Sequence, residues 1–408
     1  MELSRAEQLL LQAVSASLRG RSVTWEDVSE DEWSEMMRLA TQHKILPLVF
    51  SAVCDCPAAE QWDAKQDYRR QIKQQTVLQI KKTSDFLSLY RMMLDAGTKP
   101  IVVKGILCRQ LYPNGDLRQS GDEDLYASRE DFPKCCDVLR KFGMYPISDD
   151  SEETAEELGW RCDQSPLYIE LHRSMFSKFN DIIGKAEDWF ANSSVTPVPY
   201  ISEEKQTIYS FSEHDHLLYL LLHAYKHFIR SGFGIRQVCD IGLWAEKYLQ
   251  NIDWRLLYQQ CENVHALDFS AAIFQIAETD LSLELNLPEL WRKVKTDRMP
   301  LLKDLLSAGV YGSADFSRAH SASVTKSAVS ASRRNRSSNV LSSVFPARAS
   351  LQNQYPILRK YRILLPVIWC RRLIHYRKET KNRTKKSAIE PLKIANERKK
   401  LLKYYRII

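Results

Sequence analysis

Two aspartates separated by one residue are the first candidates for chemistry in this chain of 408 residues. The run Gly121-Asp122-Glu123-Asp124-Leu125 predicts a strand, in which side chains two positions apart project from one face. Asp122 and Asp124 would then share a face, and Glu123 would point away from them. Two like charges held so close repel each other, and a hard divalent cation relieves the repulsion because it takes oxygen ligands. A magnesium ion with a polyphosphate is the usual combination at such a site.

Two further features strengthen this interpretation, because a lone pair of aspartates is a weak signal. Lys104-Gly105 ends an earlier β-branched run, and a glycine there lets backbone N–H groups approach a phosphate beside the lysine cation. Glu170 and His172 are two residues apart in the run 168–172, a later predicted strand, so they also share a face. The sequence therefore offers three carboxylates and a cation for phosphate chemistry.

The elements that must position these residues form a small core of alternating strands and helices. Short apolar runs predict strands at 100–105, 121–127 and 168–172, with helices at 106–112 and 129–142 between them. Helical periodicity precedes this core from Glu2 to about Gly97 and returns after it, first in 214–229 and 235–249. The predicted fold class is α+β, a small mixed-sheet core embedded between N- and C-terminal helical regions.

Changes in composition and pattern predict five segments. A stretch with 12 serines in 38 residues buries too little apolar surface to offset the entropy of ordering, so it predicts a flexible linker. The segments are an N-terminal helical region (1–97), the α/β core (98–202), a C-terminal helical domain (203–312), the Ser/Arg-rich linker (313–350) and a basic amphipathic tail (351–408).

Composition excludes several classes of protein. The nine cysteines include no CxxC pair, which favours reduced thiols over structural zinc. The longest apolar run, Ile363 to Cys370, is far shorter than the ~20 residues that span a bilayer, and the N-terminus lacks a signal-peptide pattern. We therefore expect a cytoplasmic protein.

Charge is distributed unevenly along the chain. Residues 351–408 carry 17 Lys and Arg against three acids, whereas residues 1–350 carry 41 basic and 48 acidic side chains. In the tail, apolar and aromatic residues alternate with the cations, so a helix there could dock on the acidic body or lie peripherally on the inner face of the membrane. Docking is preferred over membrane contact, and nucleic acid is the least favoured partner.

The order and spacing of these motifs resemble the uncharacterised nucleotidyltransferase family of bacteria, within the polymerase-beta-like nucleotidyltransferase superfamily. The likeness covers the chain from about Lys82 to Leu249. It is carried by Lys104-Gly105, Leu111-Tyr112, Arg118, the 121–125 run, Glu170-Leu171-His172, the His-rich helix, and Arg236 with Asp240.

The resemblance implies an enzyme that transfers NMP from an NTP to a hydroxyl of an unidentified acceptor and releases pyrophosphate, an activity of EC 2.7.7 type. One or two Mg²⁺ or Mn²⁺ ions would be held by the catalytic carboxylates Asp122, Asp124 and Glu170. The nucleotide and its phosphates would be bound by Lys104, Gly105, Arg118, His172, His223 and His227.

Two positions depart from the pattern of these relatives. The superfamily usually has Gly-Ser or Gly-Gly after its first strand, whereas Gly105 is followed by Ile106, so no hydroxyl stands beside the phosphate. The middle residue of the acidic triplet is commonly apolar, and Glu123 would place a charge on a buried sheet face or mark an edge strand. Both departures favour the alternative function, a weak or inactive protein of the same fold that binds a nucleotide or a partner.

Three histidines lie on nearly one face of the helix at 214–229. His223 and His227 are four residues apart, and His216 lies two turns before His223. Packing against the core with a substrate-side contact is preferred, because zinc would need a third ligand such as Asp240. Asp240 and Arg236 are themselves spaced for a salt bridge within one helix.

Overall fold

The computed structural model describes ten stretches of the chain, and the described residues fall into two compact units. Those of Met1–His227 and Gly232–Ala314 form the first unit, and those of Phe228–Ser231 and Asp315–Ile408 form the second. None of the described helices has the length and hydropathy of a membrane span. The predicted linker at 313–350 and much of the predicted tail lie outside the described residues, which are 2–148, 151–152, 155–176, 183–191, 193–199, 207–230, 232–308, 355, 361–371 and 390–408.

A seven-stranded mixed sheet lies at the centre of the first unit, which confirms the predicted α+β class. Its order is β3-β4-β5-β2-β1-β7-β6, with β2 parallel to β5, β1 parallel to β7, and every other pair antiparallel. The strands are β1 (Ile101–Val102), β2 (Glu123–Tyr126), β3 (Tyr145–Pro146), β4 (Glu157–Arg161), β5 (Tyr168–His172), β6 (Val195–Pro199) and β7 (Thr207–Phe211).

The sheet is larger than the three predicted strands. The hairpin β3–β4 extends one side of it, and β7 with β6 extends the other. Ile101 of β1 pairs with Tyr209 of β7, so the sheet continues past residue 202, where the predicted core ends. The sequence did not predict this extension, because a short apolar run such as β7 does not indicate which distant strand it will pair with.

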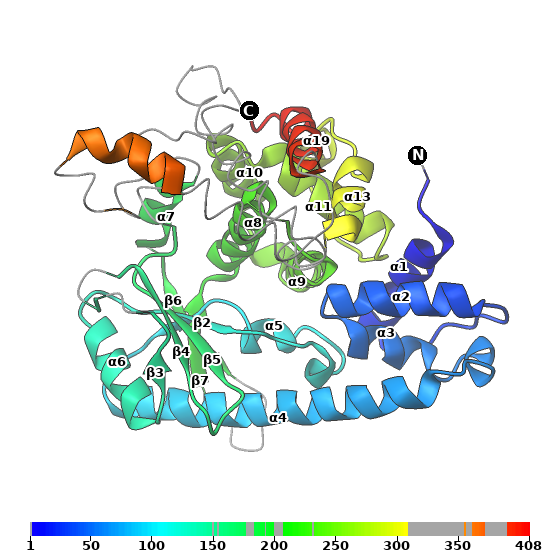
Figure 1. Ribbon diagram of the computed structural model, residues 1–408, viewed down its shortest axis with the longest axis horizontal. Coiled ribbons are helices and arrows are strands. Elements are labelled where there is room, and N and C mark those ends of the chain that lie inside the picture. Colours follow the sequence, from blue (N-terminus) through cyan, green and yellow to red (C-terminus); the bar gives the residue numbers. More distant parts are fainter. Residues whose placement is uncertain are drawn as a thin grey trace. The chain divides into compact units, whose positions relative to one another are not determined.

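Four helices and a 3₁₀ turn precede the sheet, and one of them links the N-terminal helices to it. These are α1 (Arg5–Leu18), α2 (Glu30–Gln42), α3 (Leu46–Val53), η1 (Pro57–Glu60) and α4 (Lys65–Asp95). The α4 helix has 31 residues, about 46 Å at 1.5 Å per residue. It contacts α3 and α6 (Phe132–Lys141), and Figure 1 shows it running from the N-terminal helices along the sheet.

One face of the sheet packs on α4 and α6 to form a hydrophobic core. Phe86, Leu89 and Met93 of α4 are buried in a cluster with Leu125 of β2 and Leu171 of β5. Because strand residues alternate between faces, this packing leaves Asp124 and Glu170 on the opposite face. The core thus fixes which side chains the sheet presents to the site.

The other helices of the first unit follow or interrupt the strands. Between the strands are α5 (Ile106–Arg109), η2 (Gly115–Leu117), α6, η3 (Gly184–Ala186) and α7 (Glu187–Ala191). After β7 come α8 (Glu213–Arg230), α9 (Ile235–Lys247), η4 (Leu249–Asn251), α10 (Trp254–Asn263), α11 (Leu267–Thr279), α12 (Glu289–Arg292) and α13 (Met299–Ala308). In Figure 1, α8 and α9 lie across the sheet from α4. In the second unit, the structure describes η6 (Arg362–Leu364) and α19 (Glu390–Tyr404).

Candidate functional site

Parallel pairing of β2 with β5 brings an acid from each strand to the same place. Asp124 is the register partner of Glu170, and His172 lies two residues further along β5 on the same face. The His172 Nε2 lies 3.3 Å from Asp124 Oδ1 and 3.8 Å from Glu170 Oε2. One potential ligand atom from each of these three residues lies within 4.8 Å of the others, so they could hold a metal ion together.

Asp122 joins this group through a lysine. The strand β2 begins at Glu123, so Asp122 lies just before it and not within the longer strand predicted for 121–127. The Lys104 Nζ lies 2.7 Å from Asp124 Oδ2 and 3.4 Å from Asp122 Oδ2. A lysine ammonium therefore lies between the two carboxylates, where the sequence predicts a divalent cation.

The two acids at the centre of the site have pKa values displaced in opposite directions. Burial tends to raise the pKa of Asp124, but the Lys104 charge and the hydrogen bond with His172 outweigh it and hold that pKa below its usual range. Burial, followed by repulsion from Asp124, raises the pKa of Glu170 to about 7. Neighbouring carboxylates with such different proton affinities are typical of active sites.

Glu123 points to the opposite face and is fully paired there. Its Oε1 lies 2.8 Å from the Arg109 guanidinium and accepts a hydrogen bond from Ser120 Oγ at 3.0 Å. Its Oε2 accepts the Ile106 main-chain N–H at 2.7 Å. Of the two predicted alternatives, the structure shows the charge on a buried sheet face and not on an edge strand, because β2 is an interior strand and Glu123 is buried and paired beneath the turn at Gly105.

Arg118 pairs with the buried carboxylate of Asp240. Its guanidinium donates two hydrogen bonds to the Asp240 carboxylate, at 2.7 and 2.6 Å, and Tyr112 donates a third at 2.8 Å. Arg118 also donates to the Gly105 carbonyl at 3.4 Å. The expected salt bridge within α9 is therefore replaced: the partner of Asp240 is Arg118, and Arg236 donates to the Gln119 carbonyl.

The α8 histidines have different surroundings. His216 is buried and stacks on Trp244 with ring centroids 3.9 Å apart. The Ser210 hydroxyl donates to the Val102 carbonyl, so it accepts from His216 Nδ1 at 2.9 Å. Burial lowers the pKa of His216 to about 3, as expected for a packing residue. The Nε2 atoms of His223 and His227 lie 3.2 Å apart. Among the described residues, the metal-ligand group contains neither, so nothing there supports the zinc reading.

A pocket joins several of these residues. Its wall combines residues from the Gly105 turn, the loop before β2, His223 of α8 and the start of α9. The lining residues are Lys104, Gly105, Arg118, Ser120, Asp122, His223, Arg236, Gln237 and Asp240. Four predicted residues are absent from this lining: His227, which contacts His223, and the group of Asp124, Glu170 and His172, which adjoins the pocket through Lys104.

Sequence analysis did not assign three cations near this pocket to the site. Lys82 of α4 donates to the Ser120 carbonyl at 2.9 Å, and Arg236 of α9 donates to the Gln119 carbonyl. Lys44, between α2 and α3, interacts electrostatically with Asp122. They belong to three elements far apart in the chain, so no local motif could group them. Two signals pointed to Arg236: its pairing with Asp240 among the motifs of the family resemblance, and its position in the first turn of α9, where a cation opposes the helix dipole.

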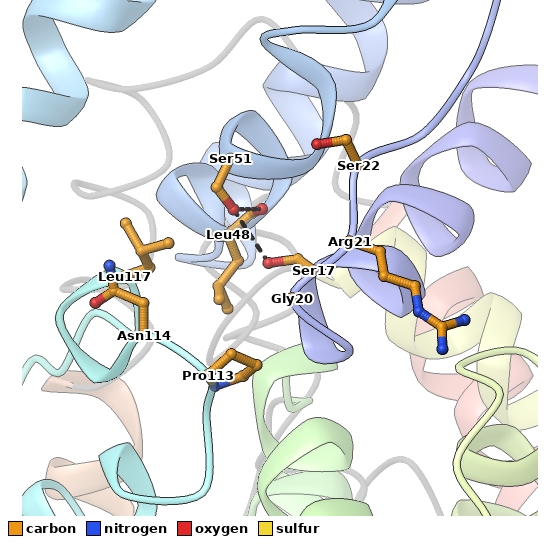
Figure 2. Close-up of a pocket in the computed structure, with 9 residues that line it drawn as sticks. All are labelled: Ser17, Gly20, Arg21, Ser22, Leu48, Ser51, Pro113, Asn114 and Leu117. Atoms are coloured by element: carbon orange, nitrogen blue, oxygen red, sulfur yellow. Dashed lines mark hydrogen bonds between the residues drawn. The ribbon is translucent and has the colours of Figure 1, made fainter.

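A second pocket lies between α1, α3 and the segment that contains η2 (Figure 2). In it, Ser51 Oγ donates to the Leu48 carbonyl at 2.7 Å and lies 3.2 Å from Ser17 Oγ. Its lining has hydroxyls, an amide and the Arg21 guanidinium, but no carboxylate. Of these two pockets, the first has carboxylates in its lining, those of Asp122 and Asp240, and the second has none.

Comparison with known proteins agrees with this geometry. A family model described as an uncharacterised nucleotidyltransferase matches residues 29–281, a range that contains every acid of the site. No curated protein and no solved structure matches the chain. The match spans more than half of the sequence and includes both the sheet and the helices that line the pocket. The chain therefore belongs to the uncharacterised nucleotidyltransferase family.

Proposed function

We propose that this protein is a metal-dependent nucleotidyltransferase that transfers an NMP group from an NTP to a hydroxyl of an acceptor and releases pyrophosphate. The observation that carries the proposal is the meeting of Asp124, Glu170 and His172 on one face of two parallel strands, with Lys104 bridging Asp124 to Asp122. Family membership supports transfer in general. The EC 2.7.7 subclass and the polymerase-beta-like superfamily are parts of the proposal.

The donor set fits a divalent cation. Carboxylate oxygens suit Mg²⁺ and Mn²⁺, and the Lys104 ammonium already lies between Asp122 and Asp124, where positive charge is needed. Asp122, Asp124 and Glu170 would hold the ion, and His172 would orient Asp124 through its 3.3 Å contact. When bound, the ion supplies charge neutralisation on the phosphates and favours ionisation of the acceptor hydroxyl.

The residues of the chain would then position the reacting groups. The acceptor oxygen forms a bond to the α-phosphorus, the bond from that phosphorus to the bridging oxygen breaks, and pyrophosphate leaves with the bonding electrons. The hydroxyl proton passes to Glu170, the half-buried acid that lies opposite Asp124 on β5. Lys104 would move from the carboxylates toward a phosphate oxygen.

The other predicted nucleotide contacts divide into two groups. Gly105 and His223 line the pocket with Lys104, so they would contact the nucleotide directly. Arg118 also lines it, but its bidentate pair with Asp240 makes it a positioning residue that supports the Gly105 carbonyl. His227 would act through its contact with His223, and His172 through Asp124.

The test is pyrophosphate release from each of the four NTPs, labelled at the α-phosphate, with Mg²⁺ or Mn²⁺ and the full chain. We expect release, and transfer of label to water or to the protein itself, in the wild type but not in Asp122→Asn or Asp124→Asn. The matched control is Asp137→Asn, an exposed aspartate that pairs with Arg140 on α6. Equal release by wild type and both site variants, or none by any of them, would overturn the transferase proposal.

A nucleotide-binding protein without transferase activity is the second candidate. The observation that favours it is the Ile106 amide, which donates to Glu123 and so is withheld from a phosphate in a turn that also lacks a hydroxyl. This candidate predicts saturable binding of an NTP with Mg²⁺, weakened in Asp124→Asn, with no pyrophosphate release. The experiment above therefore separates the two candidates.

Peripheral membrane contact through residues 351–408 stays a prediction. Its basis is the excess of cations there, 17 Lys and Arg against three acids. Flotation with anionic lipid vesicles tests it with the full chain and with a variant that lacks 351–408. We expect the deletion to abolish flotation, and unchanged partition would remove the membrane proposal.

A further inference from the structure

Three cations from separate elements converge on one loop beside the acids. Lys82 of α4 donates to the carbonyls of Ser120 at 2.9 Å and Gly121 at 3.5 Å, and Arg236 of α9 donates to the carbonyl of Gln119. A Cβ placed on Gly121 would lie 3.4 Å from Lys44 Nζ. The three side chains thus border residues 119–121, immediately before Asp122.

These cations differ from the other cations of the site in their partners. Lys104, Arg109 and Arg118 each pair with a carboxylate. In the part of the chain that the structure describes, no carboxylate forms an ion pair with Lys44, Lys82 or Arg236, and the hydrogen bonds of Lys82 and Arg236 go to main-chain carbonyls. A carbonyl carries no net charge, so these hydrogen bonds do not neutralise the cluster; Asp122, and for Lys82 also Glu123, offset part of its charge without forming an ion pair with it.

Arg236 points most directly to a ligand. It is 6% exposed and lines the pocket with Lys104 and Asp122. Its Nε–H has no hydrogen-bond partner among the described residues. A buried guanidinium with an unsatisfied donor is costly unless an anion completes it.

Lys44 is held in a conformation that a lysine rarely adopts. It follows α2 with φ of 54°, in a turn where Ile45 N–H bonds Ala40 and Lys44 N–H bonds Thr41. Glycine is the usual residue at this position, because a Cβ in the left-handed region costs roughly 1–2 kcal/mol. Next to it, His43 accepts from Ile235 N–H and contacts the Leu306 carbonyl, which ties the turn to the start of α9.

The cations also repel one another. Burial, followed by repulsion from Arg236, lowers the pKa of Lys44, and burial is likewise the largest cause lowering the pKa of Lys82. Lys44 is itself among the charges that lower the pKa of Lys82. Fixed cations that repel each other around a pocket form a favourable site for a multivalent anion.

We infer that Lys44, Lys82 and Arg236 bind the β- and γ-phosphates of the nucleotide, the part that leaves as pyrophosphate. The inference rests on the proposed function for the identity of the ligand. It assigns the phosphate contact to side chains from α2–α3, α4 and α9, in place of the hydroxyl and the amide that the Gly105-Ile106 turn does not offer. Asp122 lies between these cations and the acids that would hold the metal ion. The triphosphate would therefore extend from the metal-binding acids to the cations.

The first test is binding of inorganic tripolyphosphate to the full chain, without nucleotide or metal, by isothermal titration calorimetry. The variant is Lys44→Gln/Lys82→Gln, because both side chains reach solvent and should be replaceable without unfolding. We expect the dissociation constant to rise at least about tenfold and its salt dependence to weaken. The matched control is Lys81→Gln, the neighbouring lysine that pairs with Asp85 on α4. Equal affinity in variant and wild type, or no binding by the wild type, would overturn the inference.

The second test is kinetic, and it separates this inference from the proposed function. With NTP as substrate, we expect Lys44→Gln/Lys82→Gln to raise KM with a smaller effect on kcat, whereas Asp124→Asn lowers kcat. If Asp124→Asn abolishes transfer but the lysine variant keeps the wild-type KM, the phosphate assignment fails alone. If no NTP is turned over but tripolyphosphate binds through these lysines, the transferase proposal fails and the phosphate site stands.

Discussion

The Glu123 carboxylate accepts the main-chain N–H of Ile106 at 2.7 Å, directly beneath the Gly105 turn. Gly105 has φ of 60°, and a Cβ there would lie 1.7 Å from Glu123 Oε2. The turn that follows Lys104 therefore requires glycine at position 105, because any side chain there would collide with the buried Glu123 carboxylate.

Gly105→Ala is expected to lower the free energy of unfolding by at least about 2 kcal/mol, because the methyl group collides with Glu123 and alanine is strained at this φ. The measurement is urea denaturation followed by circular dichroism. Gly97→Ala is the matched control, since Gly97 has φ of 76° but no atom within 4 Å of its added Cβ. Equal losses in the two variants would show that the collision with Glu123 contributes nothing.

Asp240→Asn should be strongly destabilising, because it leaves the Arg118 guanidinium buried without its counter-charge. Arg118 and Asp240 have side chains only 2% and 4% exposed, and breaking such a pair costs about 3–5 kcal/mol. The midpoint of thermal unfolding measures the loss. Arg118→Met/Asp240→Leu should lose less than the single variant, and Glu35→Gln, in the exposed pair with Arg38, should change stability by less than about 1 kcal/mol. A larger loss in the double variant would contradict this account.

Stability should fall in mild acid through His43. Burial lowers the pKa of His43 to about 4, with a smaller contribution from repulsion by Arg38, so between this value and 6.5 the unfolded chain takes up a proton that the folded chain does not. The contribution of His43 is present above pH 6.5 and is lost as the pH falls toward 4, on the order of 3 kcal/mol in total. Urea denaturation at several pH values measures it. His43→Asn should show a shallower decline over that range, and an identical slope would refute the assignment.

Glu170→Gln should lower kcat by about 10²- to 10⁴-fold, because the variant cannot accept the proton of the acceptor hydroxyl. Tripolyphosphate binding should stay close to that of the wild type, because the proposed phosphate contacts are the cations that border the loop at 119–121 and Glu170 is not a phosphate contact. Single-turnover release of pyrophosphate measures the first quantity and calorimetry the second. Glu130→Gln, at an exposed position beyond β2, is the control and should leave both unchanged.

Sequence patterns predicted the strands whose residues alternate between apolar and polar, and missed those that depend on pairing with distant segments. The β5 strand runs from Tyr168 to His172 as predicted, because apolar and polar residues alternate there and Ile169 and Leu171 enter the core. The β3 strand has two residues, too few for any periodicity, and β7 pairs with a strand about a hundred positions earlier. Such pairings depend on tertiary packing and leave no local signal.

The candidate site was predictable to the same extent. Strand geometry predicts that Asp124 and Glu170 share a face, and the structure brings them together. Asp122 lies just before β2 and meets Asp124 through Lys104. The partners of the buried charges were not predictable, because Arg118 and Asp240 are 122 positions apart and Arg109 reaches Glu123 only after the turn at Gly105 forms. Charges that meet only in the folded state look unpaired in a sequence.

The parallel register of β2 and β5 also protects the site against misassembly. A slip of one residue would turn Glu170 and His172 into the layer filled by Leu125 and the α4 side chains, and would expose Ile169 and Leu171 in their place. A chain in which Ile169 and Leu171 are buried in the core therefore also has Glu170 next to Asp124. Incorrectly aligned chains would fail as unstable proteins before they could accumulate as inert ones.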